Sequence, residues 1–287
     1  MIPDADKPAA KANIPIQVAD GAKITAALEK AGYPFDIFPD GWVVNGESDD
    51  VLEAMIAENC TVDGVVIDPP WMSVATAYPV ASISGAKDKR KRSGKQWSDI
   101  LTLKMAFRYT FEAVRQLQND AGATAIFCGT VSSSVFCQWA YKWWPRLSLV
   151  PWEKNMGRVS APFVRLCEYV LFCSVSHIHD PWGGDYEEDV LRGDYHALLS
   201  PAMVCDTVPM KQRIHPAEKP VDLLERLVRI TTPPNGVVLD SFAGSCSVMR
   251  AARNIGRRFL MIEADEELYA RGVELATKYG VRKKLDL

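Results

Sequence analysis

Residues 236–264 read GVVLDSFAGSCSVMRAARNIGRRFLMIEA, and this stretch decides the fold class. Its first five residues are typical of a buried strand, residues 245–256 of a helix, and residues 258–264 of a second buried strand. Gly244 lies in the turn between strand and helix, where a glycine lets the backbone approach a ligand closely. The stretch therefore predicts a strand–helix–strand unit with parallel strands.

The same alternation of apolar runs and amphipathic segments extends through most of the chain. We expect helices at residues 22–32, 49–59, 98–119, 133–144, 219–231 and 265–280, and strands at 40–48, 62–68, 124–129, 147–154 and 168–175. Strands that alternate with helices indicate an α/β protein with a doubly wound, mostly parallel sheet. We expect a flexible tail at residues 1–14 and a single domain over residues 15–287.

Composition narrows the class of protein. The formal net charge is −3, so contacts with a nucleic acid would have to come from local basic clusters. No apolar run approaches the ~20 residues of a membrane span, and the first residues lack the apolar core of a signal peptide. The seven cysteines include no C-x-x-C pair, and we expect no metal site. These features predict a soluble, reduced, cytoplasmic protein with no membrane contact.

Four aromatic residues recur at helical spacing in the segment 133–144. They are Phe136, Trp139, Trp143 and Trp144. We expect them to pack in the core or at a subunit contact rather than to stack on nucleic-acid bases. A homodimer is therefore one of the assemblies that the sequence leaves open.

The strand at residues 62–68 ends in an unusual corner, VVIDPPW, residues 65–71. A carboxylate, two prolines with locked φ and a large aromatic follow the apolar run directly. Taken alone, this corner is consistent with a strand-ending turn that carries a surface tryptophan. The strand at 258–264 also ends in an acid, Glu263, and an acid at that place can accept hydrogen bonds from ribose hydroxyls. The glycine turn and Glu263 together predict a nucleoside-cofactor site, because the chain has no P-loop.

Four segments in this order resemble one family. They are VVIDPPW, HPAEKPVDLLERLV (residues 215–228), VVLDSFAGS (237–245) and RRFLMIEADEELYARG (257–272). Together they resemble the amino-group DNA methyltransferases, which modify adenine N6 or cytosine N4, in the permuted beta-class order. The resemblance covers residues 42 to 280 or so. It implies a seven-stranded Rossmann-like sheet, S-adenosyl-L-methionine as cofactor, and double-stranded DNA as partner with the target base flipped out of the helix.

The resemblance assigns roles residue by residue. Asp68, Pro69, Pro70 and Trp71 match the catalytic motif: the Asp68 carboxylate and the Pro69 carbonyl would accept the two N–H bonds of the target amine, and Trp71 would stack on the base. Residues that match the cofactor-binding positions are Asp240, Phe242, Ala243, Gly244, Ser245, Glu263, Lys219, Pro220, His215 and Glu47. The sequence departs from the family pattern at Cys246, which replaces a glycine and puts a side chain beside the predicted pocket.

Two further segments bear on DNA contact. We expect a mobile basic loop at residues 72–97, directly after the catalytic corner. Its predicted phosphate-binding residues are Lys87, Lys89, Arg90, Lys91, Arg92 and Lys95. Residues 176–214 occupy the place of the family's target-recognition segment, although their stretch GDYEEDVLRGD is acidic.

The favoured interpretation is a DNA methyltransferase that acts on adenine N6 at a specific site. The Asp at the head of the catalytic motif favours adenine, because the resembled cytosine enzymes more often carry Ser there. Three alternatives remain open: a cytosine-N4 DNA enzyme, an adenine-N6 RNA enzyme, and a non-catalytic cofactor-binding partner subunit. The resemblance also implies a place in restriction–modification, in a prokaryotic or phage-infected cell.

Overall fold

The structure, a computed structural model, describes residues 18–69, 100–160, 163–175, 203–209 and 218–278. The predictions for the tail 1–14, the basic loop 72–97 and most of the segment 176–214 lie outside these residues. The described helices are α1 (Gly21–Ala31), α2 (Ser48–Ala57), α4 (Ile100–Leu117), α5 (Thr130–Ala140), α8 (Val221–Thr231), α9 (Ser247–Asn254) and α10 (Glu266–Lys278). The described strands are β1 (Phe35–Phe38), β2 (Gly41–Asn45), β3 (Gly64–Ile67), β4 (Ala123–Cys128), β5 (Arg146–Ser160), β6 (Phe163–Ser174), β7 (Met203–Val204), β8 (Val237–Asp240) and β9 (Arg258–Glu263).

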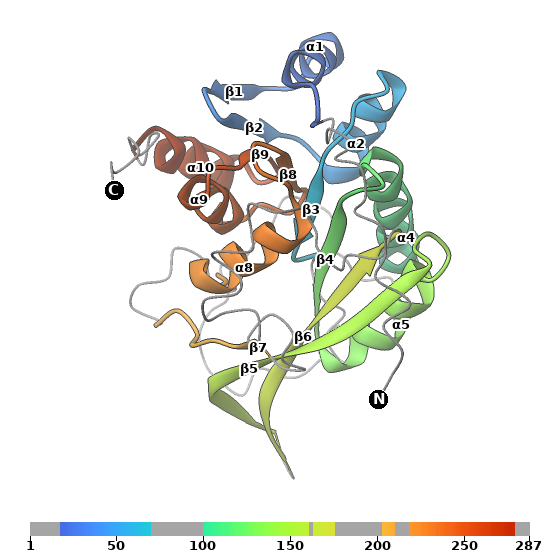
Figure 1. Ribbon diagram of the computed structural model, residues 1–287, viewed down its shortest axis with the longest axis vertical. Coiled ribbons are helices and arrows are strands. Elements are labelled where there is room, and N and C mark those ends of the chain that lie inside the picture. The colour runs from blue at the N-terminus through green and yellow to red at the C-terminus, as the bar shows by residue number, and fades with distance from the viewer. Residues whose placement is uncertain (1–17, 70–99, 161–162, 176–202, 210–217, 279–287) are drawn as a thin grey trace, which may run out of the picture.

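All of these strands belong to one mixed sheet. Within the described residues its order is β1-β2-β9-β8-β3-β4-β6-β5-β7 (Figure 1). Strands β2, β9, β8, β3 and β4 are parallel, and β6 runs antiparallel to β4 and β5. The predicted α/β class and mostly parallel sheet are confirmed. The expected seven strands correspond to β2, β9, β8, β3, β4, β6 and β5. Strand β1 extends one edge of this sheet, and the two-residue β7 extends the other.

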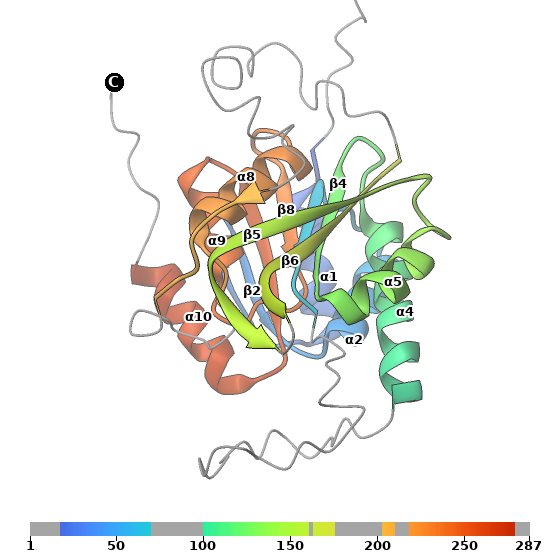
Figure 2. The same cartoon turned by 90° about the horizontal axis from the view of Figure 1, so that it is seen from below.

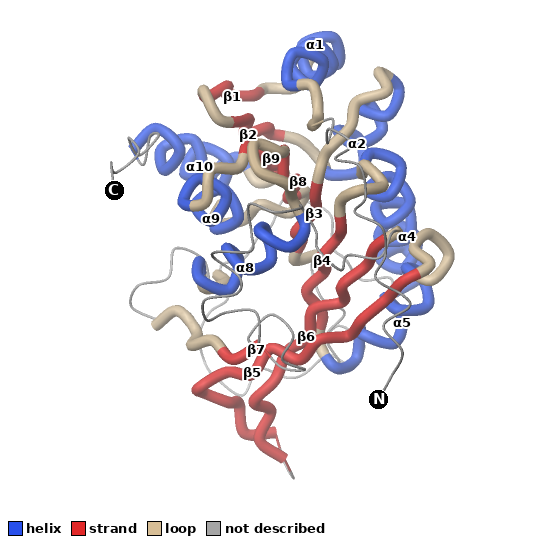
Figure 3. The backbone as a smooth tube through the Cα atoms, in the orientation of Figure 1, coloured by secondary structure: helices blue, strands red, loops and turns tan. Residues whose placement is uncertain are grey.

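Helices cover both faces of the sheet (Figures 1 and 3). On one face α1, α2, α4 and α5 pack over side chains such as Val44, Val65 and Ile67. On the other face α8, α9 and α10 pack over alternate residues of the same strands, among them Val43 and Val66. Two-sided burial explains why these strands are continuous apolar runs rather than alternating ones.

The chain reverses its direction of winding between β3 and β8. From β3 it crosses through α4 to β4 on one side, and from β8 it crosses through α9 to β9 on the other side. Strands β3 and β8 are nevertheless direct parallel neighbours, with Gly64 opposite Val238 and Val65 opposite Leu239. In sheets of this kind, ligands bind beyond the carboxyl ends of the strands at such a point of reversal.

Strands β5 and β6 are longer than predicted and form a twisted antiparallel pair (Figure 2). Their register shifts between Glu153 and Arg158, which marks a bulge. The indole N–H of Trp152 donates to the carbonyl of Cys205 at 3.0 Å, so that β7 is attached to the edge of β5. The sequence pattern missed the outer parts of both strands, which extend beyond the helical layers (Figure 1).

The aromatic residues of the segment 133–144 pack in the core, as predicted. Phe136 and Trp144 are fully buried. The ring of Phe111 in α4 meets Phe136 edge-on at 5.3 Å and Trp139 at 5.9 Å. All seven cysteines are unpaired, and four of them are buried, as expected of small core residues. Among the described helices, none combines the length and the apolar character that a bilayer crossing needs.

The side chain of Cys246 points into the core rather than into the predicted pocket. Cys246 is fully buried and begins α9 in the left-handed conformation, with φ of 53°. A methyl group added to Gly272 in α10 would lie 2.6 Å from the Cys246 sulfur and 3.9 Å from its Cβ. A glycine at 272 therefore makes room for the cysteine that replaces a glycine at 246.

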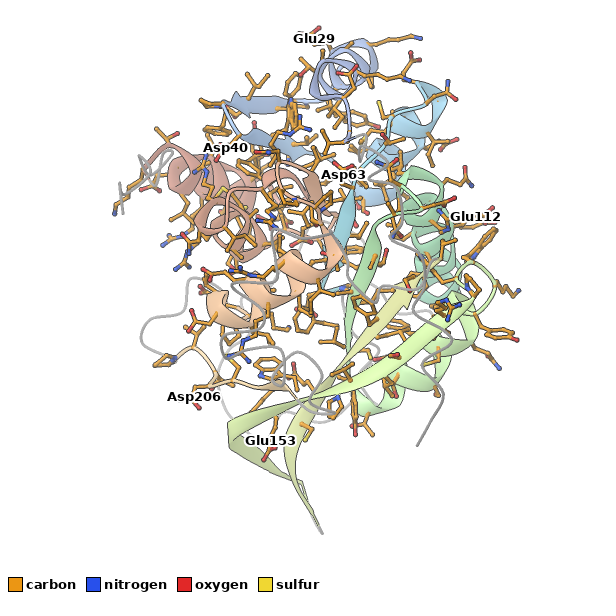
Figure 4. All side chains as sticks on the ribbon, in the orientation of Figure 1. Glu29, Asp40, Asp63, Glu112, Glu153 and Asp206 are labelled. Atoms are coloured by element: carbon orange, nitrogen blue, oxygen red, sulfur yellow. The ribbon has the colours of Figure 1, made fainter. Side chains whose placement is uncertain are left out.

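Asp63 joins four segments at the end of the sheet opposite the carboxyl ends of the strands. Its buried carboxylate accepts hydrogen bonds from the backbone N–H of Ala19 and of Val237, and from the Asn119 amide at 2.7 Å. Asp63 directly precedes β3 and Val237 begins β8, so this carboxylate fastens the starts of the two central strands together. Figure 4 shows Asp63 in the interior and Asp206 at the edge of the molecule.

Replacing Asp63 with alanine should lower the free energy of unfolding by at least about 3 kcal/mol, because buried N–H donors would lose a charged acceptor. Urea denaturation followed by circular dichroism measures the change. The matched control is Asp206→Ala, which removes an exposed carboxylate and should stay within about 0.5 kcal/mol. Equal stability of the two variants would contradict the proposed role of Asp63.

Gly272→Ala should lower the free energy of unfolding by about 1–3 kcal/mol, because its new methyl group collides with the Cys246 sulfur. In a Cys246→Ala background the same change should be neutral or stabilising, since the remaining neighbours, Val43 Cγ1 at 3.6 Å and the residue-246 Cβ at 3.9 Å, are ordinary van der Waals contacts and alanine is the better helix former. A double-mutant cycle of unfolding free energies tests this coupling. Additive effects of the two substitutions would show that the residues do not compete for space.

Candidate active site

Asp68 and Pro69 follow the carboxyl end of β3 directly. Asp68 is partly buried and Pro69 is buried. Their partners in the predicted catalytic motif, Pro70 and Trp71, lie outside the described residues. The apolar strand places an acid and a conformationally fixed carbonyl at the rim of the sheet, next to β8.

The turn after β8 begins with Asp240, which is 4% exposed. Its carboxylate accepts a hydrogen bond from the backbone N–H of Phe242 at 3.0 Å, and the N–H of Ala243 donates to the carbonyl of Ile262. Gly244 follows with φ of 50°, in the left-handed region that favours glycine. At the start of α9 the hydroxyls of Ser245 and Ser247 share a hydrogen bond of 2.7 Å. These hydrogen bonds, within the turn and to Ile262 of β9, hold the backbone of the turn in place.

Glu263 holds the same turn from the neighbouring strand. One oxygen of its carboxylate accepts the N–H of Gly244 at 2.7 Å, and the other accepts the N–H of Asp265 at 2.9 Å. Its backbone carbonyl accepts the side-chain amide of Asn45, at the end of β2. The residue predicted to bind ribose thus also fixes the glycine turn, and each oxygen retains further lone-pair capacity.

Lys219 brings a cation to the ends of these strands. Its ammonium group donates to the Oδ2 atom of Asp68, although the two residues are 151 positions apart in the sequence. The same nitrogen lies 4.9 Å from the centre of the Phe127 ring, on β4. Pro220, the next residue, is buried and forms the N-cap of α8. The structure therefore joins two motifs that the sequence keeps far apart.

The acids at this rim influence one another. Burial raises the pKa of Asp240 to about 8; the Phe242 N–H opposes this shift, Asp68 and Glu263 add to it, and Lys219 opposes it. Burial also raises the pKa of Glu263, against the hydrogen bonds that its carboxylate accepts from the backbone of Asp265, Gly244 and Ala264. A buried, partly protonated carboxyl beside other acids is a favourable place for a cationic group of a ligand.

The remaining predicted site residues are placed as follows. Glu47 is exposed and forms the N-cap of α2, two residues beyond the pairing of Asn45 with Glu263. His215 and the six basic residues between Lys87 and Lys95 lie outside the described residues. Within the described part of the chain, no cluster of His, Cys, Asp and Glu residues has the arrangement of a metal site.

The sequence patterns assigned no role to Phe127 or to Asn45. Phe127 lies inside an apolar strand run, so only the pairing of β4 beside β3 shows that it contacts Lys219. Asn45 is marked only by its place at the end of β2, and its contact with Glu263 depends on the register of β2 against β9. Phe127 contacts Lys219 and Asn45 contacts Glu263, and the motifs do identify both of these partners.

Comparison with known proteins places the chain in a family. The family model described as "DNA methylase" (N6_N4_Mtase) matches residues 62–274. Type II methyltransferase M1.MboII of Moraxella bovis is 40% identical over 242 residues, which cover 73% of this chain and 87% of that protein. Matches to several other curated relatives are short and span 15% to 26% of their length. One of these is the DNA adenine methyltransferase YhdJ of Escherichia coli, 35% identical over 72 residues.

Solved structures share the fold. The M1.HpyAVI–SAM complex superposes with a TM-score of 0.55 at 20% identity, covering 80% of this chain and 96% of that chain. The cytosine-N4-specific PvuII DNA methyltransferase superposes with a TM-score of 0.57 at 15% identity, covering 82% of this chain and 86% of that chain. At these identities the likeness concerns the fold alone. Because the family model covers well over half of the 287 residues, this chain belongs to the N6_N4_Mtase family of DNA methylases.

Proposed function

We propose that this protein transfers a methyl group from S-adenosyl-L-methionine to the exocyclic N6 of an adenine in double-stranded DNA. One observation carries the proposal: Asp68, at the end of β3, lies beside the glycine turn after β8, at the point where the winding of the sheet reverses. Family membership supports the coarser part of the statement, an amino-group DNA methylase.

The proposed chemistry follows from the corner at Asp68. The lone pair of an exocyclic amine is delocalised into the ring, so the nitrogen is a weak nucleophile. Hydrogen bonds from its two N–H groups to the Asp68 carboxylate and the Pro69 carbonyl would favour a pyramidal, attack-ready amine. As the new N–C bond forms, the methyl–sulfur bond breaks, sulfur keeps the electron pair, and the nitrogen releases a proton.

The residues around the glycine turn fit the proposed cofactor. When bound, S-adenosyl-L-methionine supplies a methyl group activated by a sulfonium, and it also carries ribose hydroxyls and an ammonium group. Glu263 is placed to accept from hydroxyls, and the buried carboxyl of Asp240 is placed to pair with a cation. Glu47 is proposed to lie near the adenine ring of the cofactor, and Lys219 and Pro220 near its methionine end.

Adenine is proposed over cytosine because an Asp heads the D-P-P-W motif. The adenine-specific name of the relative YhdJ is in line with this choice. The cytosine-N4 enzyme among the structural neighbours keeps the second candidate open. The flipped target base, the phosphate contacts of the loop 72–97, a homodimer and a role in restriction–modification are further parts of the proposal.

Binding of S-adenosyl-L-methionine should release about one proton near pH 7, because the Asp240 carboxyl, with a pKa of about 8, is protonated in the free protein and ionises beside a cation. The affinity should therefore rise with pH up to about 8 and then level off. Titration calorimetry in buffers of different ionisation enthalpy measures the proton count.

The control variants separate Asp240 from other acids. Asp240→Asn should remove the proton release, whereas Asp206→Asn, which changes an exposed acid outside the site, should retain it. A binding heat that does not depend on the buffer would contradict the assigned role of Asp240.

The function itself is tested by methyl transfer to unmethylated genomic DNA, using tritium-labelled S-adenosyl-L-methionine and mass spectrometry of the digested nucleosides. We expect N6-methyladenine. Asp68→Ala should lower the rate by on the order of 10³-fold, because the amine loses an electrostatic acceptor in the transition state. Asp36→Ala, which changes an acid of the edge strand β1, serves as the matched control and should keep the wild-type rate.

The other products each decide between alternatives. N4-methylcytosine would replace the adenine assignment with the second candidate. A clear preference for single-stranded RNA over duplex DNA would favour an RNA enzyme. Binding of the cofactor without transfer to any nucleic acid would favour a non-catalytic partner subunit.

A further inference from the structure

The contact between Lys219 and Asp68 joins a residue proposed for cofactor binding to the residue proposed for catalysis. Both side chains are largely withdrawn from solvent: the Lys219 side chain is 9% exposed and that of Asp68 is 24% exposed. An ion pair this buried is screened little by water, so it holds the Asp68 carboxylate more strongly than a surface pair would.

The position of Lys219 is fixed from several sides. The preceding residue, Glu218, is buried and accepts a hydrogen bond from Arg250 of α9 at 3.1 Å. The following residue, Pro220, begins α8 with a locked φ. The ammonium group lies over the face of Phe127, whose ring meets Trp152 edge-on at 6.1 Å. These contacts hold the cation at one place beside Asp68 instead of leaving it on a freely moving side chain.

Several ionisable groups lie around Asp68. Besides Lys219 it faces the buried acid Asp240 on β8, with Glu263 beyond it on β9. On the other side lies Cys128 of β4, a buried thiol whose pKa is raised to about 12 by burial, so that it stays neutral. Among these described neighbours, Lys219 is the group that donates to the Asp68 carboxylate.

We infer that Lys219 is a positioning residue for the methyl transfer: it fixes the orientation of the Asp68 carboxylate. The inference rests on the proposed function. With the ammonium group on Oδ2, rotation of the carboxylate is restricted, and the direction of Oδ1 is set relative to the Pro69 carbonyl. A carboxylate free to rotate would present its acceptor oxygen to the target amine in the productive direction for only part of the time.

A role in cofactor binding alone makes different predictions. A lysine that only pairs with the cofactor would set the KM for S-adenosyl-L-methionine and would leave the rate at saturation unchanged. A lysine that orients the Asp68 carboxylate acts on the transfer step, so its loss lowers the rate at saturation. Arginine keeps the charge but has a wider, planar head group, so Lys219→Arg separates charge from position.

The experiment measures single-turnover methyl transfer to unmethylated genomic DNA at neutral pH, at concentrations of S-adenosyl-L-methionine up to saturation. Saturation is verified for each variant by calorimetry, and folding by circular dichroism. The variants are Lys219→Met, Lys219→Gln and Lys219→Arg. The matched control is Lys30→Met, which removes an exposed lysine of α1 that is paired with Glu58.

We expect Lys219→Met and Lys219→Gln to lower the saturated rate at neutral pH by on the order of 10²-fold. The KM for S-adenosyl-L-methionine should change much less than this rate. Lys219→Arg should also lose saturated rate, because its wider head group changes the position of the charge, and Lys30→Met should match the wild type in both quantities.

A saturated rate within about twofold of the wild type, with only KM raised, would overturn the inference. If the charge-free variants do not fold, Lys219→Arg decides: a reduced saturated rate with little change in KM supports the inference, and a wild-type saturated rate with a raised KM contradicts it. Failure of the proposed function is seen separately, as absence of methyl transfer by the wild-type protein.

Discussion

The structure depends on the parallel pairing of β3 with β8. This pairing sets two strand ends side by side although they are separated by most of the chain, and it does so where the sheet changes its direction of winding. The pairing needs a glycine at position 64, because the chain before β8 packs closely against it. A methyl group on Gly64 would lie 2.1 Å from the Thr232 hydroxyl oxygen and 2.5 Å from the Thr231 carbonyl oxygen. The Asp63 carboxylate then bonds to the first residue of β8. Both constraints act at the far end of the strands and set the register that places Asp68 next to Asp240.

Among the described residues, the site sets three acids beside Lys219. Asp68, Asp240 and Glu263 come from three neighbouring strands, and each accepts a hydrogen bond from a nearby donor. In a protein with a net charge of −3, such a concentration of acids favours cationic ligands and is unfavourable for a bare phosphate. A sulfonium with an ammonium group suits this environment, whereas contacts with DNA phosphates have to come from other segments.

The sequence predicted the strands around Val65, Val238 and Ile262 and the helices between them, because two-sided burial and glycine turns leave a strong local pattern. It did not predict β1, a four-residue edge strand with little burial, or the full length of β5 and β6. The side-chain direction of Cys246 and the Lys219–Asp68 contact also escaped prediction, because they depend on distant residues brought together only by the fold. Motifs locate candidate residues, and tertiary packing decides which of them touch.

The account is tested most directly by a crystal structure of the protein with S-adenosyl-L-methionine. We predict that the ribose contacts Glu263, that the methionine ammonium lies beside Asp240, and that the sulfonium methyl faces the space between the Asp68 carboxylate and the Pro69 carbonyl, at about 3–4 Å from where the target nitrogen would sit. A cofactor bound away from the β3–β8 junction, or with its methyl group directed away from Asp68, would contradict the account.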